Sequence, residues 1–194
     1  MKKSDLEYVE RLKKWNISEK YISEVNFLEL LLKPKKGENI LDYGCGTGFC
    51  LNLLKSITNA NYYGYDVNVF FDDDIIPEWF INKIDIGIKF DKIYFMHSFA
   101  HIKNNNEMLQ NIKLILMEKG KIYIITPNKD FDEYYKQLKD ENYTPDNTVI
   151  KHYSIDDLVH LLTANEYIIE VIGQFGKKIS YFQERIFVIA SLKK

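Results

Sequence analysis

The feature that most constrains the fold is residues 40–48, Ile-Leu-Asp-Tyr-Gly-Cys-Gly-Thr-Gly, where an apolar run meets three closely spaced glycines. The apolar run predicts a short buried strand, and the amphipathic stretch from Phe49 to Ile57 predicts a helix directly after the turn. Glycine adopts the left-handed conformations of a tight turn and lets a ligand approach the backbone closely. Because the helix start also offers unpaired N–H groups, this unit predicts a ligand-binding corner.

The spacing of the glycines narrows the choice of ligand. Gly44, Gly46 and Gly48 follow a G-x-G-x-G pattern. Phe49 stands where the dinucleotide fingerprint G-x-G-x-x-G has its third glycine, which argues against a nicotinamide-dependent enzyme. The next predicted strand ends in Asp66, whose carboxylate can accept hydrogen bonds from both hydroxyls of a ribose.

These motifs resemble those of a known family. The segment Leu-Asp-Tyr-Gly-Cys-Gly-Thr-Gly, followed by the acidic Asp66, closely resembles motif I of the class I S-adenosylmethionine (SAM) dependent methyltransferases. Residues 117–128, a turn and a strand that ends in Thr-Pro-Asn, resemble the family's fifth strand. The likeness covers residues 38–128 well and implies an enzyme that uses SAM as methyl donor and leaves S-adenosylhomocysteine as product.

The resemblance also implies a set of cofactor-binding residues. In the family the glycine turn wraps the methionine end of SAM, and an acidic residue after the third strand receives the adenine amino group. Asp85 matches that acidic position, with a backbone group nearby as the alternative acceptor, and Ile86 would pack on the adenine ring. The full predicted set is Asp42, Gly44, Cys45, Gly46, Asp66, Val67, Asp85, Ile86 and Met96.

Two histidines are the candidate catalytic residues. His97 and His101 follow the apolar run of residues 93–96, at the carboxyl end of a parallel strand, where open α/β sheets bind ligands. Histidine titrates near neutral pH, so either residue is a candidate general base for the methyl acceptor. Both also have a purely structural interpretation, and His152 is the next candidate.

A metal-dependent mechanism is not expected. The ubiquinone-pathway O-methyltransferases and the small-RNA 2′-O-methyltransferases carry a Glu-x-x-Glu-His pattern at this point, which binds a divalent ion. Here residues 97–101 read His-Ser-Phe-Ala-His, so the last histidine matches and both carboxylates are absent. Magnesium prefers oxygen ligands, and the sequence indicates no third ligand for zinc.

The order of predicted elements indicates the fold class. We expect an α/β fold, a Rossmann-like three-layer sandwich around a mainly parallel seven-stranded sheet with an antiparallel last strand. The predicted strands lie at 39–42, 61–66, 79–84, 93–96, within 117–128, at 167–172 and at 185–191. We expect a single domain with an N-terminal helical segment (1–36), a SAM-binding core (37–128), a substrate-cover insertion (129–153) and a C-terminal helix and strand pair (154–194).

The N-terminal segment predicts two helices, the second of which begins after Ser18. Its predicted buried face consists of Tyr21, Ile22, Val25, Leu28 and Leu32.

Composition bears on the partner and the compartment. Lys and Arg total 26 against 28 for Asp and Glu, a net charge of -2, so nothing indicates a basic surface for nucleic acid. We therefore expect a small-molecule acceptor, methylated on oxygen or nitrogen. RNA 2′-O-methylation and a non-catalytic SAM-binding protein are the alternatives. Two cysteines and no apolar leader or membrane-spanning run favour a cytoplasmic protein, and the oligomeric state is left open.

Overall fold

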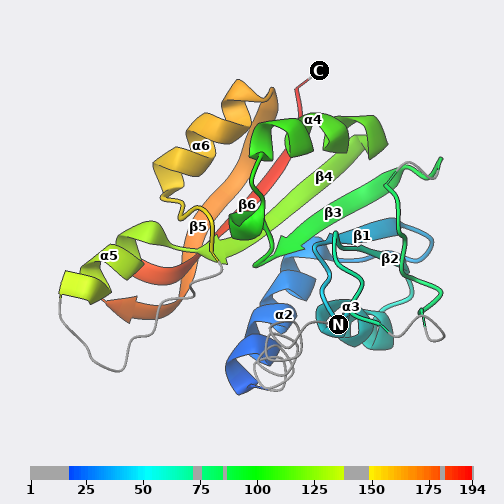
Figure 1. Cartoon of the computed structure of the whole chain (residues 1–194), viewed down its shortest axis with the longest axis horizontal. Helices are drawn as coiled ribbons and strands as arrows, with labels where there is room; N and C mark the ends of the chain where they lie inside the picture. Colours follow the sequence, from blue (N-terminus) through cyan, green and yellow to red (C-terminus); the bar gives the residue numbers. More distant parts are fainter. Residues whose placement is uncertain (1–17, 72–75, 85–86, 138–148, 180–181, 194) are drawn as a thin grey trace.

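The computed structural model describes residues 18–71, 76–84, 87–137, 149–179 and 182–193 (Figure 1). In chain order its helices and strands are α2 (Glu19–Leu32), β1 (Asn39–Tyr43), α3 (Phe49–Ile57), β2 (Asn61–Tyr65), β3 (Phe90–Met96), the 3₁₀ helix η1 (Phe99–His101), α4 (Asn105–Ile115), β4 (Leu116–Pro127), α5 (Lys129–Gln137), α6 (Ile155–Ala164), β5 (Tyr167–Ile179) and β6 (Phe182–Leu192).

The strands form one mixed sheet in the order β2-β1-β3-β4-β6-β5. Strands β2, β1, β3 and β4 are parallel, and β6 runs antiparallel to both β4 and β5. The predicted α/β fold with a mainly parallel sheet and an antiparallel last strand is confirmed. Because parallel strands end at the same edge, the residues that follow β1, β2, β3 and β4 share one side of the molecule.

The predicted seventh strand, at residues 79–84, is not confirmed among the described residues. A single parallel bridge joins Gly64 of β2 to Phe80, where that strand would have extended the sheet. Backbone hydrogen bonds of 2.9 and 2.8 Å flank the bridge, and Pro77 just before it has no N–H to donate. The indole of Trp79 packs back on the glycine turn, so this segment follows the turn rather than the edge of β2.

Helices cover both faces of the sheet (Figure 1), and an apolar layer lies between the sheet and the helices on each face. One face packs against α4 and α6, and the other packs against α2 and α3. Strand β3 serves both, because Ile93 and Phe95 belong to the first layer and Tyr94 and Met96 to the second. This alternation with a period of two is what a strand buried on both faces requires, and it gives the expected three-layer sandwich.

Helices α2 and α3 begin where the sequence predicts. The hydroxyl of Ser18 caps α2, α3 begins at Phe49, and Ser154 opens α6 with a capping box. The predicted buried face of α2 does not include Glu24, but the structure buries this residue at 5% exposure. Ile22, predicted to be buried, is 36% exposed.

The first predicted N-terminal helix lies outside the described residues. No helix within the described ranges has the length and apolar character that a bilayer crossing needs.

Candidate functional site

The glycine turn connects β1 to α3 at the carboxyl edge of the sheet. Gly44, Gly46 and Gly48 have φ angles of 83°, 53° and 74°, so all three adopt the left-handed region that glycine favours. The N–H groups of Gly44 and Cys45 both donate to the carbonyl of Tyr65, over 2.7 and 3.0 Å. These bonds fasten the turn to the end of β2.

Neighbouring side chains explain two of these glycines. A Cβ on Gly44 would lie 2.3 Å from the Cβ of Ser98, and one on Gly48 would lie 2.1 Å from the ring of Trp79. The same ring would be 2.7 Å from a Cβ on Gly64. Trp79 therefore packs against the turn at Gly48, and Ser98, which follows β3, packs against it at Gly44. The sequence pattern did not reveal these packing roles.

Asp66 lies beside the turn, as the motif predicts. Its Oδ2 accepts the N–H of Gly46 at 2.9 Å and its Oδ1 accepts the N–H of Asn68 at 3.0 Å. Burial raises the pKa of Asp66, while its backbone hydrogen bonds and His101 act against that shift. The next residue, Val67, is 80% exposed at the same edge.

Asp42 is a buried carboxyl without a full set of partners. It is 1% exposed, and no polar group of the described residues lies within normal hydrogen-bond distance of its Oδ1. Burial raises the pKa of Asp42 to about 8; the nearby Tyr94 opposes the shift and the charge of Asp66 adds to it. The group is therefore protonated at neutral pH.

The structure describes two of the other predicted cofactor residues, Cys45 and Met96, and leaves two outside its described ranges. Cys45 and Met96 are buried at the ends of β1 and β3, and burial raises the pKa of the Cys45 thiol. Asp85 and Ile86 lie outside the described residues. The seven described members of the predicted set therefore gather along the carboxyl ends of β1, β2 and β3, and their contacts with a cofactor remain a prediction.

His97 is the first residue after β3 and has an unusual backbone. Its φ of 62° is uncommon for a residue with a bulky side chain. Its N–H donates to the carbonyl of Ile125 at 2.9 Å, which extends the pairing of β3 with β4. The left-handed residue then turns the chain, and the buried imidazole contacts α2.

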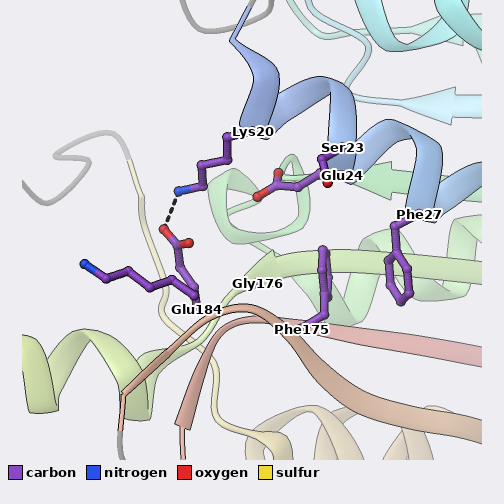
Figure 2. Close-up of a pocket in the computed structure, with 8 residues that line it drawn as sticks. Lys20, Ser23, Glu24, Phe27, Phe175, Gly176 and Glu184 are labelled. Carbon is purple, nitrogen blue, oxygen red and sulfur yellow. Dashed lines mark hydrogen bonds and ion pairs between the residues drawn. The ribbon is translucent and has the colours of Figure 1, made fainter.

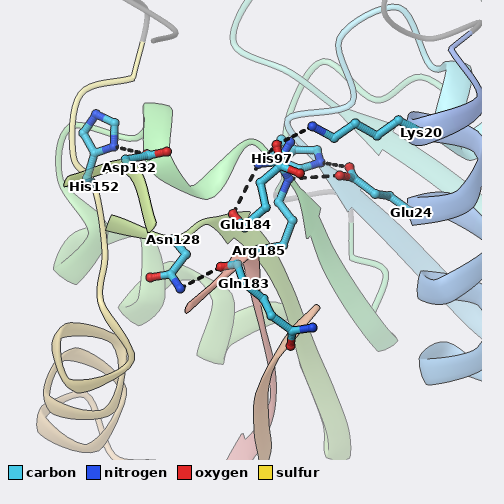
Figure 3. A network of polar contacts seen from close by, with 9 residues as sticks. All are labelled: Lys20, Glu24, His97, Asn128, Asp132, His152, Gln183, Glu184 and Arg185. Atoms are coloured by element: carbon cyan, nitrogen blue, oxygen red, sulfur yellow. Dashed lines mark hydrogen bonds and ion pairs between the residues drawn. The ribbon is translucent and has the colours of Figure 1, made fainter. Parts of the chain in front are cut away.

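An ion cluster, buried at Glu24, His97 and Arg185, surrounds this imidazole (Figure 3). Nε2 of His97 lies 2.5 Å from Oε2 of Glu24, and Nε of Arg185 donates to Oε1 of Glu24 at 3.0 Å. Arg185 also pairs with Glu184 at 3.5 Å, and Glu184 pairs with Lys20. The cluster, Lys20, Glu24, His97, Glu184 and Arg185, joins α2, the end of β3 and β6.

The charges of the cluster set its protonation. Burial by itself raises the pKa of Glu24, but His97 and Arg185 lower it to about 2, so the carboxylate is ionised. Burial lowers the pKa of His97; Glu24 opposes this, and Arg185 adds to it. At neutral pH the imidazole is therefore neutral. Because an ionised carboxylate only accepts hydrogen bonds, Nε2 carries the ring proton.

The structure does not place the other candidate histidines beside His97. His101 ends η1, is half-buried, and interacts electrostatically with Asp66 on the side of the glycine turn. His152 pairs through Nδ1 with Oδ2 of the buried Asp132 at 3.1 Å, and Figure 3 shows this pair apart from the ion cluster.

A half-open pocket borders the ion cluster (Figure 2). Its volume is about 330 Å³, and it lies between α2 and the hairpin of β5 and β6. The rings of Phe27 and Phe175 pack with their centroids 4.3 Å apart on one side of it. Lys20, Glu24 and Glu184 belong to both the pocket lining and the cluster.

Within the described ranges, no three His, Cys, Asp or Glu side chains are placed to hold a metal ion.

Comparison with known proteins identifies the family. Residues 13–170 match a family model described as a methyltransferase domain. No curated protein matches the sequence. The chain therefore belongs to the methyltransferase domain family and is a SAM-dependent methyltransferase.

Solved structures share the fold at low sequence identity. A SAM-dependent methyltransferase from Clostridium acetobutylicum ATCC 824 has a TM-score of 0.63 and 16% identity, with 97% of this chain and 98% of that one covered. Magnesium protoporphyrin IX methyltransferase from Synechocystis PCC 6803, with bound S-adenosylhomocysteine, has a TM-score of 0.63, 14% identity and coverages of 88% and 83%. The small RNA methyltransferase HEN1 has a TM-score of 0.65 and 12% identity over 89% of this chain and 25% of that one.

Proposed function

We propose that this methyltransferase transfers the methyl group of SAM to an oxygen or nitrogen of a small-molecule acceptor. The observation that carries the proposal is the pocket beside the ion cluster. Glu184 lines this pocket, and its neighbour Arg185 pairs with Pro127, the last residue of β4. The pocket therefore lies at the edge of the sheet where β4 ends. A volume of about 330 Å³ lies within the range of small-molecule sites.

The glycine turn and Asp66 fit the methyl donor. When bound, SAM supplies a methyl group on a positively charged sulfur, already activated for attack. The turn offers a backbone surface with little side-chain bulk, and the carboxylate of Asp66 has lone pairs left for the ribose hydroxyls. Hydrogen bonds to a charged group contribute roughly 1.5–3 kcal/mol each.

The lining of the pocket supports an acceptor with an apolar body and at least one polar group. Phe27 and Phe175 offer aromatic surface. The charges of Lys20 and Lys177 are balanced by those of Glu24 and Glu184, so the lining has no excess of positive charge for a phosphate backbone.

His97 is the residue that we assign as general base. Its imidazole is neutral at neutral pH and is held by the same carboxylate that borders the pocket. His97 itself does not line the pocket, so the acceptor's O–H or N–H group has to extend past Glu24 to give its proton to this base. His101, near Asp66, is assigned to the cofactor side of the site.

The free thiols support the proposed cytoplasmic location. Cys45 and Cys50 are both buried and unbridged, as expected in a reducing compartment.

The experiment that tests the proposal follows a labelled methyl group. The protein is incubated with methyl-labelled SAM and, separately, with a small-molecule metabolite fraction or with total RNA. We expect label in a metabolite whose mass increases by one methyl group. Label in RNA alone would favour an RNA methyltransferase, the activity named for the structural neighbour HEN1. SAM binding with no transfer to either fraction would favour a non-catalytic SAM-binding protein.

A further inference from the structure

Glu24 divides its two carboxylate oxygens between two partners. Oε2 meets Nε2 of His97 at 2.5 Å and Oε1 accepts from Nε of Arg185 at 3.0 Å. All three side chains are at most 10% exposed. Each partner comes from a different element, so the carboxylate is held by the fold rather than by one flexible segment.

We propose that Glu24 and Arg185 are positioning residues for His97. The carboxylate of Glu24 fixes the imidazole in the Nε2–H tautomer, and Arg185 fixes the carboxylate. This inference rests on the proposed function, in which His97 is the base. It adds two residues, one from α2 and one from β6, that the glycine motif does not include.

The tautomer determines which ring nitrogen accepts the proton. With the hydrogen of Nε2 directed at Glu24, the lone pair of the ring lies on Nδ1. In the reaction the acceptor's oxygen or nitrogen bonds to the methyl carbon as the carbon–sulfur bond breaks, and that electron pair stays on the sulfur. The acceptor's proton bonds to Nδ1, and the imidazolium that forms is stabilised by Glu24.

The backbone of His97 supports the positioning of its ring. A φ of 62° is uncommon for a residue other than glycine, and it fixes the direction in which the side chain of His97 leaves the backbone. A buried ion pair is weak evidence for stability, because well-packed apolar side chains of similar volume often do as well. The cluster and this backbone conformation together thus hold one imidazole in one orientation.

Among the described residues, charged and titratable groups of two elements act on His97. Glu24, Lys20 and Tyr21 lie on α2, with the Tyr21 ring centroid 6.1 Å from that of His97. Arg185 and Glu184 lie on β6. Glu24 favours the protonated imidazole, whereas Arg185 and Lys20 disfavour it. Removing Glu24 should therefore lower the titration midpoint of His97, whereas removing Arg185 should raise it.

The test is a nitrogen-15 NMR titration of the histidine rings in the full chain, with the His97 signals assigned by their loss in His97→Asn. We expect the Nε2–H tautomer in the unmodified protein. Glu24→Gln should lower the titration midpoint of His97 by roughly one pH unit, and Arg185→Met should raise it by a similar amount. Glu170→Gln is the matched control, because it changes a surface ion pair with Lys121 in the same chemical way.

An Nδ1–H tautomer, or midpoints that do not move in Glu24→Gln and Arg185→Met, would overturn the proposal. If Arg185→Met does not fold, Arg185→Lys and the double variant Glu24→Gln/Arg185→Met replace it. Arg185→Lys should keep the midpoint of the unmodified protein. In the double variant the two shifts oppose each other, so its midpoint should lie above that of Glu24→Gln.

Kinetics separate this inference from the proposed function. Once an acceptor is found, Glu24→Gln should lower kcat on the order of 100-fold with unchanged SAM affinity, because a displaced base reacts poorly. Transfer at full rate in Glu24→Gln would overturn the positioning role alone. Absence of transfer in every fraction, with the predicted tautomer present, would overturn the proposed function and with it the catalytic purpose of the cluster.

Discussion

Replacing Asp42 by Asn should stabilise the protein, although the residue belongs to the glycine motif. The carboxyl is fully buried, and its pKa rises from 3.8 to about 8. At pH 7 the unfolded chain therefore ionises this carboxyl, whereas the folded chain keeps it protonated. Because pH 7 lies about three units above the unfolded pKa, ionisation of this carboxyl favours the unfolded state by about 4 kcal/mol.

The pH dependence follows from the direction of this shift. As pH rises from about 4, the unfolded state releases the proton first, so the free energy of unfolding falls until about pH 8 and then levels off. Asn does not ionise, so the variant lacks this loss. Burying an amide with incomplete hydrogen bonds costs about 1–2 kcal/mol, which leaves a net gain of about 2–3 kcal/mol at pH 7.

Urea unfolding at pH 5, 7 and 8 measures the effect. We expect the gain of Asp42→Asn to grow by about 1.4 kcal/mol per pH unit over this range. Asp156→Asn, at an exposed position in the first turn of α6, controls for the loss of one negative charge. Equal or lower stability of Asp42→Asn at pH 7, or a gain that does not change with pH, would refute the reasoning.

Further predictions concern the binding and catalytic groups. Asp66→Ala should weaken SAM binding by about 2–4 kcal/mol, measured by calorimetry on the folded variant; unchanged affinity would mean that the carboxylate does not meet the ribose. Gly44→Ala should destabilise the protein by more than about 2 kcal/mol in urea unfolding, since its φ is 83° and its Cβ would lie 2.3 Å from Ser98; wild-type stability would contradict this packing. His97→Ala should lower turnover roughly 100- to 10,000-fold with SAM affinity retained, and full turnover would make the residue structural. A chelator should leave turnover unchanged, and inhibition rescued by a divalent ion would favour a metal-dependent mechanism.

Local patterns were sufficient to predict the core of the fold. The glycine turn, the start of α2 after Ser18 and the start of α3 at Phe49 depend on residues close in sequence, and all three are confirmed. The predicted seventh strand is not confirmed. Residues 79–84 are apolar enough for a strand, but Pro77 and the packing of Trp79 limit the pairing to one bridge.

The ion cluster depends on contacts that are distant in sequence. His97 meets Glu24 across 73 positions, and Arg185 meets Glu24 across 161. One signal was present in the sequence, because Glu24 lies on the face of α2 that also buries Tyr21, Val25 and Leu28. A charge on an apolar stripe predicts a buried partner, but only the folded sheet shows that the partners are His97 and Arg185.

Isothermal titration calorimetry of the unmodified protein tests most directly whether the glycine turn and Asp66 form a SAM site. SAM and S-adenosylhomocysteine should both bind, and NAD should not, because the turn has the G-x-G-x-G spacing and Asp66 lies against it. Binding of NAD that is tighter than binding of SAM would contradict the assignment.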